Sequence, residues 1–412
     1  MKVYKLIVPL ILIVIAMSVF YKINETVRES YPAAHMLSEP LHEYAKKLLK
    51  EKDADGGYIT AISLTAQCAD DAPVSVAEGT IGIKDLTPIQ ENSIFQIGSV
   101  TKSFISIVIL QIAEENNISI DDDTIMMKWF PEYPKWGNIT LRELMNMTSG
   151  IPGNGNRLPD DIFKKFTAKE YLNMIDPVQI LNLTYQLPLH FEPGTGFEYS
   201  NTNYTLLGRF IKKVTHNDPE KEVTDRIISK LSLRNTYFPI DLEEEIPNID
   251  TGNLVHGYAF YSKNADSYPF MPYGADTLPY SLSYANTGGA MISTPQDINT
   301  YLHAVFAQDG AFNKYQKQLT TFVSRKTGAP ISAPTIEDRQ GFGLGILGYY
   351  WDAAHPIVYL FNGTMDGFKF AWLVDPKSQM YLTVAINSHA DLVNLEDALR
   401  LFEKLESSCQ FH

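Results

Sequence analysis

Residues 95–115 read Phe-Gln-Ile-Gly-Ser-Val-Thr-Lys-Ser-Phe-Ile-Ser-Ile-Val-Ile-Leu-Gln-Ile-Ala-Glu-Glu, a stretch whose long apolar segment begins with a serine and a lysine three residues apart. From Ser99 onward, apolar residues dominate at helical spacing, which predicts a largely buried helix. Ser99 stands at the start of that helix. Lys102 follows three positions later, so its amine can approach the Ser99 hydroxyl on the same helix face.

This Ser-x-x-Lys pair predicts nucleophilic chemistry. A serine hydroxyl is a weak nucleophile unless a neighbouring base takes its proton. A partly buried lysine with a lowered pKa can be that base, and a helix N-terminus favours a developing oxyanion. The alternative is a surface helix that begins with a capping serine and a solvated lysine. Because both flanks are apolar, we predict a buried pair with Ser99 as nucleophile and Lys102 as base.

The order of predicted elements gives the fold class. Strands are predicted at 58–66 and 74–83 and again at 341–350, 357–361, 369–374 and 380–386, with helices at 41–50, 294–307 and 392–405 and short helices between 121 and 287. Strands at both ends with helices between them predict an α+β fold, in which an antiparallel sheet built from both chain ends is flanked by helices and carries an inserted all-helical lobe. We expect one domain over 36–412, with an α/β lobe (36–100 and 290–412), a helical lobe (101–289) and a small-molecule cleft between them.

The N-terminus has the pattern of an export signal. Lys2 and Lys5 precede an apolar run over 6–20, and polar sequence follows. This predicts that residues 1–24 are a signal peptide or an N-terminal membrane anchor. The run is short for a spanning helix of about 20 residues. We therefore expect an exported protein, either periplasmic or attached through residues 6–20 to the outer face of the cytoplasmic membrane.

Composition excludes several classes of function. The formal net charge is −14, and an acidic protein is not attracted to nucleic acid. Cys68 and Cys409 are the two cysteines, too few for a cysteine-based metal site. In an oxidising compartment they can form one disulfide; the alternative is two buried thiols. The chain has no His-Glu-x-x-His, and its nine histidines suggest no metal cluster, so we predict no metal and no cofactor.

A second group of candidate residues lies in the loop 193–204, which reads Pro-Gly-Thr-Gly-Phe-Glu-Tyr-Ser-Asn-Thr-Asn-Tyr. A tyrosine can relay the serine proton to a leaving group, and an asparagine amide can hydrogen-bond a substrate carbonyl. Tyr-x-Asn also occurs at 171–173 and 284–286. The Pro-Gly loop directly before a helix favours Tyr199 and Asn201.

These motifs together resemble the serine β-lactamase and penicillin-binding-protein superfamily, specifically the branch with class C β-lactamases, D-alanyl-D-alanine carboxypeptidases and family VIII carboxylesterases. The matching segments are Ser-x-x-Lys at 99–102, Leu-Arg-Glu-Leu at 141–144 with Thr-Ser-Gly at 148–150, the loop with Tyr-Ser-Asn at 199–201, Gly-Gly-Ala-Met-Ile-Ser-Thr at 288–294 with Asp297, and Gly-Phe-Gly-Leu-Gly at 341–345. The resemblance covers about residues 40–405. It implies the fold predicted above, with the active serine between sheet and helical lobe.

The chain departs from this family at its third motif. The family has Lys or His, a variable residue and Gly on the strand beside the site, and this chain has Phe361-Asn362-Gly363. A lost charge-assisted hydrogen bond is worth about 1.5–3 kcal/mol, which disfavours a substrate carboxylate or a β-lactam. The alternative is that Phe361 is plain sheet core and the alignment slips by one. The resemblance places the oxyanion hole at the amides of Ser99 and Thr364.

The expected reaction is acyl transfer through a covalent Ser99 ester. Lys102 and Tyr199 handle the proton, Asn201 positions the acyl carbonyl, and residues 361–364 bind substrate. The expected partner is a small molecule or peptide: a cell-wall D-peptide, a β-lactam or an ester. The resemblance implies D-Ala-D-Ala carboxypeptidase activity first and small-ester carboxylesterase activity second. The rival is a non-catalytic cell-envelope binding protein that keeps the fold.

Overall fold

The computed structural model describes residues 33–153, 166–239, 251–261, 271–393 and 395–409. The predicted signal peptide or anchor at 1–24, with its apolar run at 6–20, lies outside these residues. Within the described part of the chain, no helix has the length and apolar character needed to cross a membrane.

A nine-stranded sheet forms the centre of the molecule, and its strand order is β2-β1-β11-β10-β9-β8-β7-β5-β6. The strands are β1(Ala61–Cys68), β2(Val74–Gly79), β5(Phe322–Ser324), β6(Pro330–Ile331), β7(Gln340–Phe342), β8(Leu347–Tyr349), β9(Val358–Met365), β10(Phe368–Asp375) and β11(Met380–Ile386). Neighbouring strands are antiparallel, and β1 pairs with β11, so that Ile62 lies opposite Ile386. The sheet therefore joins both ends of the chain, which confirms the predicted fold class.

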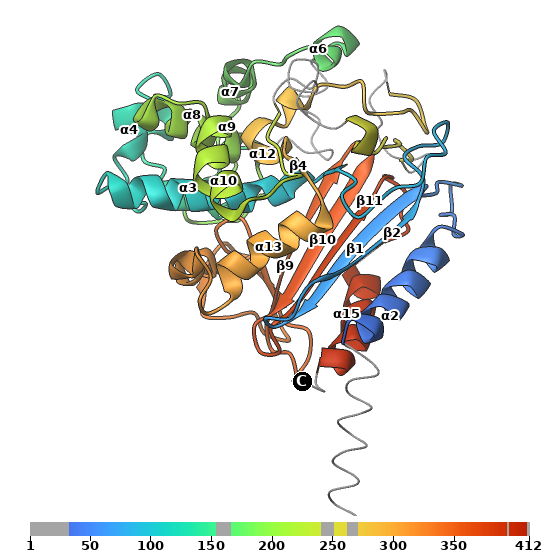
Figure 1. Cartoon of the computed structure of the whole chain (residues 1–412). Helices are drawn as coiled ribbons and strands as arrows, with labels where there is room; N and C mark the ends of the chain where they lie inside the picture. Colours follow the sequence, from blue (N-terminus) through green and yellow to red (C-terminus); the bar gives the residue numbers. More distant parts are fainter. Residues whose placement is uncertain (1–32, 154–165, 240–250, 262–270, 394, 410–412) are drawn as a thin grey trace, which may run out of the picture.

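Helices cover both faces of the sheet. In Figure 1, α2(Ala33–Leu48) and α15(Leu395–Cys409) lie side by side on one face, and α13(Pro295–Phe306) crosses the other. Every residue of β1 and β11 is buried as a result. Because both of its faces are covered, β11 reads as a nearly continuous apolar run, whereas β1 alternates and buries the polar residues Ser63, Thr65 and Gln67.

A group of helices forms the second part of the molecule (Figure 1). Its members are α3(Thr101–Glu115), α4(Ile125–Trp129), α5(Leu141–Met145), α6(Ala168–Leu172), α7(Pro177–Tyr185), α8(Asn201–Thr215), α9(Pro219–Val223), α10(Ser229–Leu231) and α12(Asn286–Gly289). Helix α3 packs against α8, α9 and α12 and is buried from Thr101 to Ala113. A helix that is apolar on all sides belongs in such a central position, as its sequence predicted.

Most predicted strands have different bounds in the structure: the strands predicted at 58–66, 74–83 and 369–374 are β1, β2 and β10, at 61–68, 74–79 and 368–375. The segment predicted as one strand at 341–350 is a hairpin of β7 and β8, turned at Gly345 with φ +76°. A Cβ at that glycine would lie 2.8 Å from the Tyr204 hydroxyl and 2.9 Å from the Lys102 carbonyl oxygen. Strand β9 continues beyond Phe361 to Met365, because its pairing with β10 extends to the turn that joins them. The turn of the hairpin therefore lies against the first turn of α3.

Cys68 and Cys409 form a disulfide in the structure, with their Cα atoms 5.5 Å apart. The bond joins the end of β1 to the end of α15. Of the two alternatives that the sequence left open, the structure therefore has the bridge, which ties the last helix to the N-terminal part of the sheet.

Candidate active site

Ser99 lies in a tight turn between sheet and helical lobe. The short strand β3(Phe95–Gln96) pairs with β4(Ile292–Ser293), and the chain then turns through Gly98, at φ +51°, into η1(Gly98–Val100) and α3. A positive φ is readily adopted by glycine. One helical turn later, Lys102 Nζ lies 3.1 Å from Ser99 Oγ. The two residues therefore meet as their spacing predicts.

The Lys102 amine is completely buried and has three polar neighbours. Besides Ser99 Oγ, it donates to Asn201 Oδ1 at 2.7 Å and to the Gly288 carbonyl oxygen at 2.6 Å. Both of these oxygens can only accept. A neutral amine has two N–H groups and one lone pair, so two donated bonds leave the lone pair for the Ser99 hydroxyl. Burial lowers the pKa of Lys102 well below its ordinary value, which favours this neutral form.

Tyr199 completes the contacts to the serine. Its hydroxyl donates to Ser99 Oγ at 2.7 Å. Burial raises the pKa of the Tyr199 phenol above its ordinary value, an effect opposed by the hydrogen bond with Ser99 and by the positive charge of Arg325. The phenol is therefore protonated at neutral pH. Ser99 Oγ lies between a base that can accept its proton and an acid that can donate one.

The loop that carries Tyr199 is held by the Thr-Ser-Gly segment at 148–150. The Gly194 amide donates to the Thr148 carbonyl at 2.8 Å. The Ser149 hydroxyl donates to Asn203 Oδ1 at 2.8 Å, in the first turn of α8. These contacts fix the approach to α8, which begins at Asn201. The segment 148–150 therefore positions Tyr199 and Asn201 from a distance.

Two glycines let β9 pack against the serine turn. A Cβ at Gly363 would lie 1.8 Å from the Ile97 carbonyl oxygen and 2.8 Å from the Ser99 amide nitrogen. A Cβ at Gly98 would lie 2.8 Å from the Thr364 amide nitrogen. A side chain at either position would push apart the Ser99 and Thr364 amides, which the family resemblance places in the oxyanion hole.

The register of β9 gives the direction of the Thr364 amide. Met365 lies opposite Phe368 across a two-residue turn, and such a closing pair exchanges backbone hydrogen bonds. In the next pair, Thr364 and Lys369 point their N–H groups away from each other. Pairing between β8 and β9 reaches only Leu360, so the Thr364 N–H points to an edge without a partner strand, on the side of Ser99.

Phe361 stands where the family has a cation, and its ring is buried among other aromatic rings. Its side chain is 3% exposed, and its ring lies 5.8 Å from that of Phe342. Phe342 in turn contacts the rings of Phe197, at 5.5 Å, and Tyr199, at 6.1 Å. Phe361 is thus a core residue, and the close approach of Gly363 to Ser99 supports the alignment of residues 361–363 with the third motif.

A cation near Tyr199 comes from a different part of the chain. Arg325 follows β5, bonds Gln340 Oε1, and holds its guanidinium carbon 5.5 Å from the Phe197 ring centre. A cavity of about 370 Å³ extends from Arg325 along β9 past Asn362 and Thr364. Ser99, Lys102 and Tyr199 are not among its lining residues.

Sequence reasoning missed several parts of this site. The structure brings Ser99, Lys102, Tyr199 and Asn201 into one hydrogen-bonded group and sets Gly363 beside it. The missed parts are the Gly288 carbonyl, Arg325 and the Phe342 ring. Gly288 and Phe342 stand in motifs that were recognised, but a backbone carbonyl or a packed ring gives no sequence signal of its role. Arg325 stands in no motif.

The fold is shared with solved structures of amide hydrolases. A D-stereospecific amidohydrolase from Streptomyces sp. is 25% identical, with a TM-score of 0.68 over 88% of this chain and 97% of its own. D-amino acid amidase from Ochrobactrum anthropi SV3 has a TM-score of 0.69 over 92% of this chain and 98% of its own, at 20% identity. At that level of identity, the second likeness shows the fold alone.

Sequence relatives and a family model point the same way. Protein flp of Staphylococcus aureus (strain MW2) is 24% identical over 304 residues, which are 73% of this chain and 54% of that protein. Penicillin-binding protein 4* of Bacillus subtilis (strain 168) is 31% identical over 128 residues, 31% of this chain and 27% of its own length. The chain thus spans about half the length of Flp. The Beta-lactamase family model matches residues 70–404, and this protein therefore belongs to the serine β-lactamase and penicillin-binding-protein superfamily.

Proposed function

We propose that this protein is a serine hydrolase that cleaves small amides or esters through a covalent acyl-Ser99 intermediate. The observation that carries the proposal is the bonding of Lys102, whose amine faces two carbonyl acceptors and the Ser99 hydroxyl. This set gives a neutral amine one unused lone pair, directed at the nucleophile. Acyl transfer needs such a base.

In the proposed reaction each group has a separate role, which the geometry supports. Lys102 takes the Ser99 proton as Oγ attacks the substrate carbonyl, and the amides of Ser99 and Thr364 donate to the oxyanion. Tyr199 then donates its proton to the leaving amine or alcohol and recovers one from Lys102, whose Nζ lies 4.9 Å from the centre of its ring. Water releases the acyl group by the reverse sequence. Asn201 holds Lys102 by its carbonyl oxygen.

The substrate that fits best has no free carboxylate beside the scissile bond. Phe361 is buried among aromatic rings where the family has a cation, so β9 offers no ion pair there. Amides and small esters lack this carboxylate, and one structural relative is named a D-amino acid amidase. We therefore favour D-amino acid amides and small esters over D-Ala-D-Ala peptides, the class that the sequence resemblance put first.

The proposed location is outside the cytoplasm, periplasmic or attached to the membrane. The basic and apolar N-terminal pattern supports export. The disulfide between Cys68 and Cys409 is consistent with an oxidising compartment. Detection of the protein in periplasmic and membrane fractions, with N-terminal sequencing, distinguishes a cleaved signal from an anchor.

The test of the proposed reaction is hydrolysis of a chromogenic short-chain ester, a D-amino acid amide and a D-Ala-D-Ala peptide by the purified protein. Ser99→Ala is expected to abolish turnover and covalent labelling by an acylating probe. Ser103→Ala, one turn further along α3, is the matched control and should retain both. Labelling that persists in Ser99→Ala would exclude Ser99 as nucleophile. A wild-type protein that neither turns over nor labels would support the non-catalytic envelope protein.

A further inference from the structure

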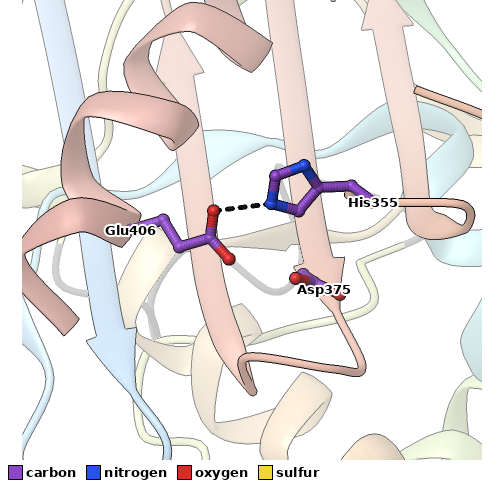
Figure 2. Close-up of side chains that lie close together, drawn as sticks. All are labelled: His355, Asp375 and Glu406. Atoms are coloured by element: carbon purple, nitrogen blue, oxygen red, sulfur yellow. Dashed lines mark hydrogen bonds and ion pairs between the residues drawn. The ribbon is translucent and has the colours of Figure 1, made fainter. Parts of the chain in front are cut away.

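A second cluster of reactive side chains lies far from Ser99. His355 lies between β8 and β9, Asp375 ends β10, and Glu406 belongs to the last turns of α15 (Figure 2). One potential ligand atom from each lies within 4.8 Å of the others. Asp375 is six residues along β10 from the partner of Thr364, which is about 20 Å at the usual rise of a strand. The cluster is therefore separate from the candidate active site.

The cluster places two buried carboxylates side by side. Asp375 is 1% exposed and Glu406 is 6% exposed. Asp375 accepts from the amides of Lys377, at 2.9 Å, and Ser378, at 3.4 Å, and from the Ser378 hydroxyl at 2.9 Å. These bonds satisfy part of its capacity but bring no full positive charge. Neither carboxylate forms an ion pair with a lysine or arginine among the described residues.

Glu406 has a single hydrogen-bonding neighbour in the described chain, His355, whose Nε2 lies 2.7 Å from Glu406 Oε2. The second oxygen of this carboxylate lies on the side of Asp375 in Figure 2. A protonated imidazole would balance only one of the two negative charges. Burying negative charge without an equal positive charge nearby is unfavourable. The net negative charge of this cluster therefore favours binding of a cation.

The second imidazole nitrogen of His355, Nδ1, faces a third carboxylate, that of Asp352. His355 Nδ1 lies 3.1 Å from Asp352 Oδ1. Asp352 is itself fixed, because the same oxygen accepts from the amides of Ala354 and His355 at 2.8 and 2.7 Å. A carboxylate on one imidazole nitrogen, with the other nitrogen directed at further ligands, is the arrangement that orients metal-bound histidines.

We propose that His355 Nε2, Asp375 and Glu406 bind one divalent first-row transition ion, for which Zn²⁺ is the probe. The ligand set of one imidazole and two carboxylates suits Zn²⁺ better than Ca²⁺ or Mg²⁺, which prefer oxygen ligands alone. Water occupies the fourth position. A protonated His355 releases its Nε2 proton on binding, and its separation from Glu406 widens to about 3.4 Å, a normal spacing between ligands of a tetrahedral ion. Binding brings all three ligand atoms, which lie within 4.8 Å of one another, to this spacing.

The bound ion would fasten three distant segments together. His355 comes from a loop, Asp375 from the sheet and Glu406 from α15. Cys409, three residues after Glu406, is joined to β1 by the disulfide. The proposed role is therefore to hold the last turns of α15 against the sheet beside the covalent link, although the water at the fourth position distinguishes the site from closed structural zinc sites.

The test is titration of the full-length, metal-free protein with ZnCl₂ by calorimetry and with CoCl₂ by visible absorption. We expect one ion per chain and a rise in Tm of a few degrees. His355→Ala and Glu406→Gln should each weaken binding by at least about 10-fold, because losing a ligand costs no less than losing a hydrogen-bond partner of a ligand, which is worth about 10- to 100-fold. His303→Ala is the matched control, because His303 forms a pair with the exposed Asp70 and belongs to no such cluster among the described residues.

Two outcomes would overturn the proposal. One is the absence of stoichiometric binding in the wild-type protein. The other is equal affinity in the wild-type protein and in the ligand variants. Circular dichroism reports whether His355→Ala is folded. If it is not, the affinity of Glu406→Gln for Zn²⁺ tests the proposal, because this substitution keeps the shape of the side chain. The result does not depend on hydrolysis at Ser99, so the two proposals can fail independently.

Discussion

Replacing Lys102 by alanine removes the proposed base, whose Nζ lies 3.1 Å from Ser99 Oγ. General-base catalysis contributes about 10²- to 10⁴-fold in rate, equivalent to about 2.7–5.4 kcal/mol of transition-state stabilisation. The substitution also leaves Asn201 Oδ1 and the Gly288 carbonyl without their amine donor. Each unpaired acceptor costs about 1–3 kcal/mol of folding stability. Removal of a buried amine offsets part of that cost, because the amine itself is poorly solvated.

The measurement is the single-turnover rate of Ser99 acylation by a chromogenic ester, followed as release of the alcohol. Lys212→Ala, at an exposed lysine of α8, is the control and should acylate at the wild-type rate. Lys102→Met fills more of the space of the amine and separates loss of the base from loss of packing. An alanine variant that is folded and acylates within twofold of wild type would refute the role of Lys102.

The lowered pKa of Lys102 also predicts how the acylation rate and the free energy of unfolding change with pH. Because burial lowers the pKa of Lys102, acylation should fall as pH decreases through that pKa and the amine gains a proton. At pH values between the folded pKa of Lys102 and its unfolded value of about 10.4, the amine is protonated in the unfolded chain and neutral in the folded protein. The free energy of unfolding therefore increases as pH rises through this range, by up to about 1.36 kcal/mol per pH unit. Below the folded pKa both states are protonated, and this slope vanishes. Urea unfolding at several pH values should show the slope in wild type and not in Lys102→Ala.

Three further substitutions test other parts of the structure. Tyr199→Phe should slow amide cleavage by about 10²-fold and cleavage of a nitrophenyl ester less, because that leaving group needs no proton; equal effects would contradict its role as acid. Gly363→Ala should reduce acylation at least about 10²-fold, since its Cβ would lie 1.8 Å from the Ile97 carbonyl and displace an oxyanion donor; an unchanged rate would exclude Thr364 as that donor. Cys409→Ser should lower the free energy of unfolding by about 2–5 kcal/mol in urea titrations, and no difference would show that the bridge to Cys68 does not form.

The sequence predicted those features that depend on neighbouring residues. The pair Ser99 and Lys102 is separated by one helical turn, so local geometry alone brings the two together. The arrangement of the sheet followed from runs of apolar residues at both chain ends, which need a common core. The hairpin at Gly345 was missed because β7 and β8 are each three residues long and the apolar pattern continues across their turn.

Features that depend on distant backbone positions could not be predicted. The Gly288 carbonyl reaches Lys102 only because α12 packs against α3. The cluster of His355, Asp375 and Glu406 draws on a loop, a strand end and a helix, and its spacings of 20 and 31 residues match no local motif. The expectation of no metal site relied on such motifs, which detect ligands that are close in sequence.

The replacement of the family cation by Phe361 has two separable consequences. A cation on β9 would act both on the catalytic tyrosine and on a substrate carboxylate. The positive charge of Arg325 still opposes the rise in the pKa of Tyr199, so the first effect is partly kept by a different segment. Arg325 is exposed in the turn after β5, where solvent weakens its field, and the ring of Phe361 covers the strand position itself. In the proposed reaction, the acid therefore keeps a neighbouring charge while the substrate has no ion pair on β9, and we expect neutral amides and esters to be preferred.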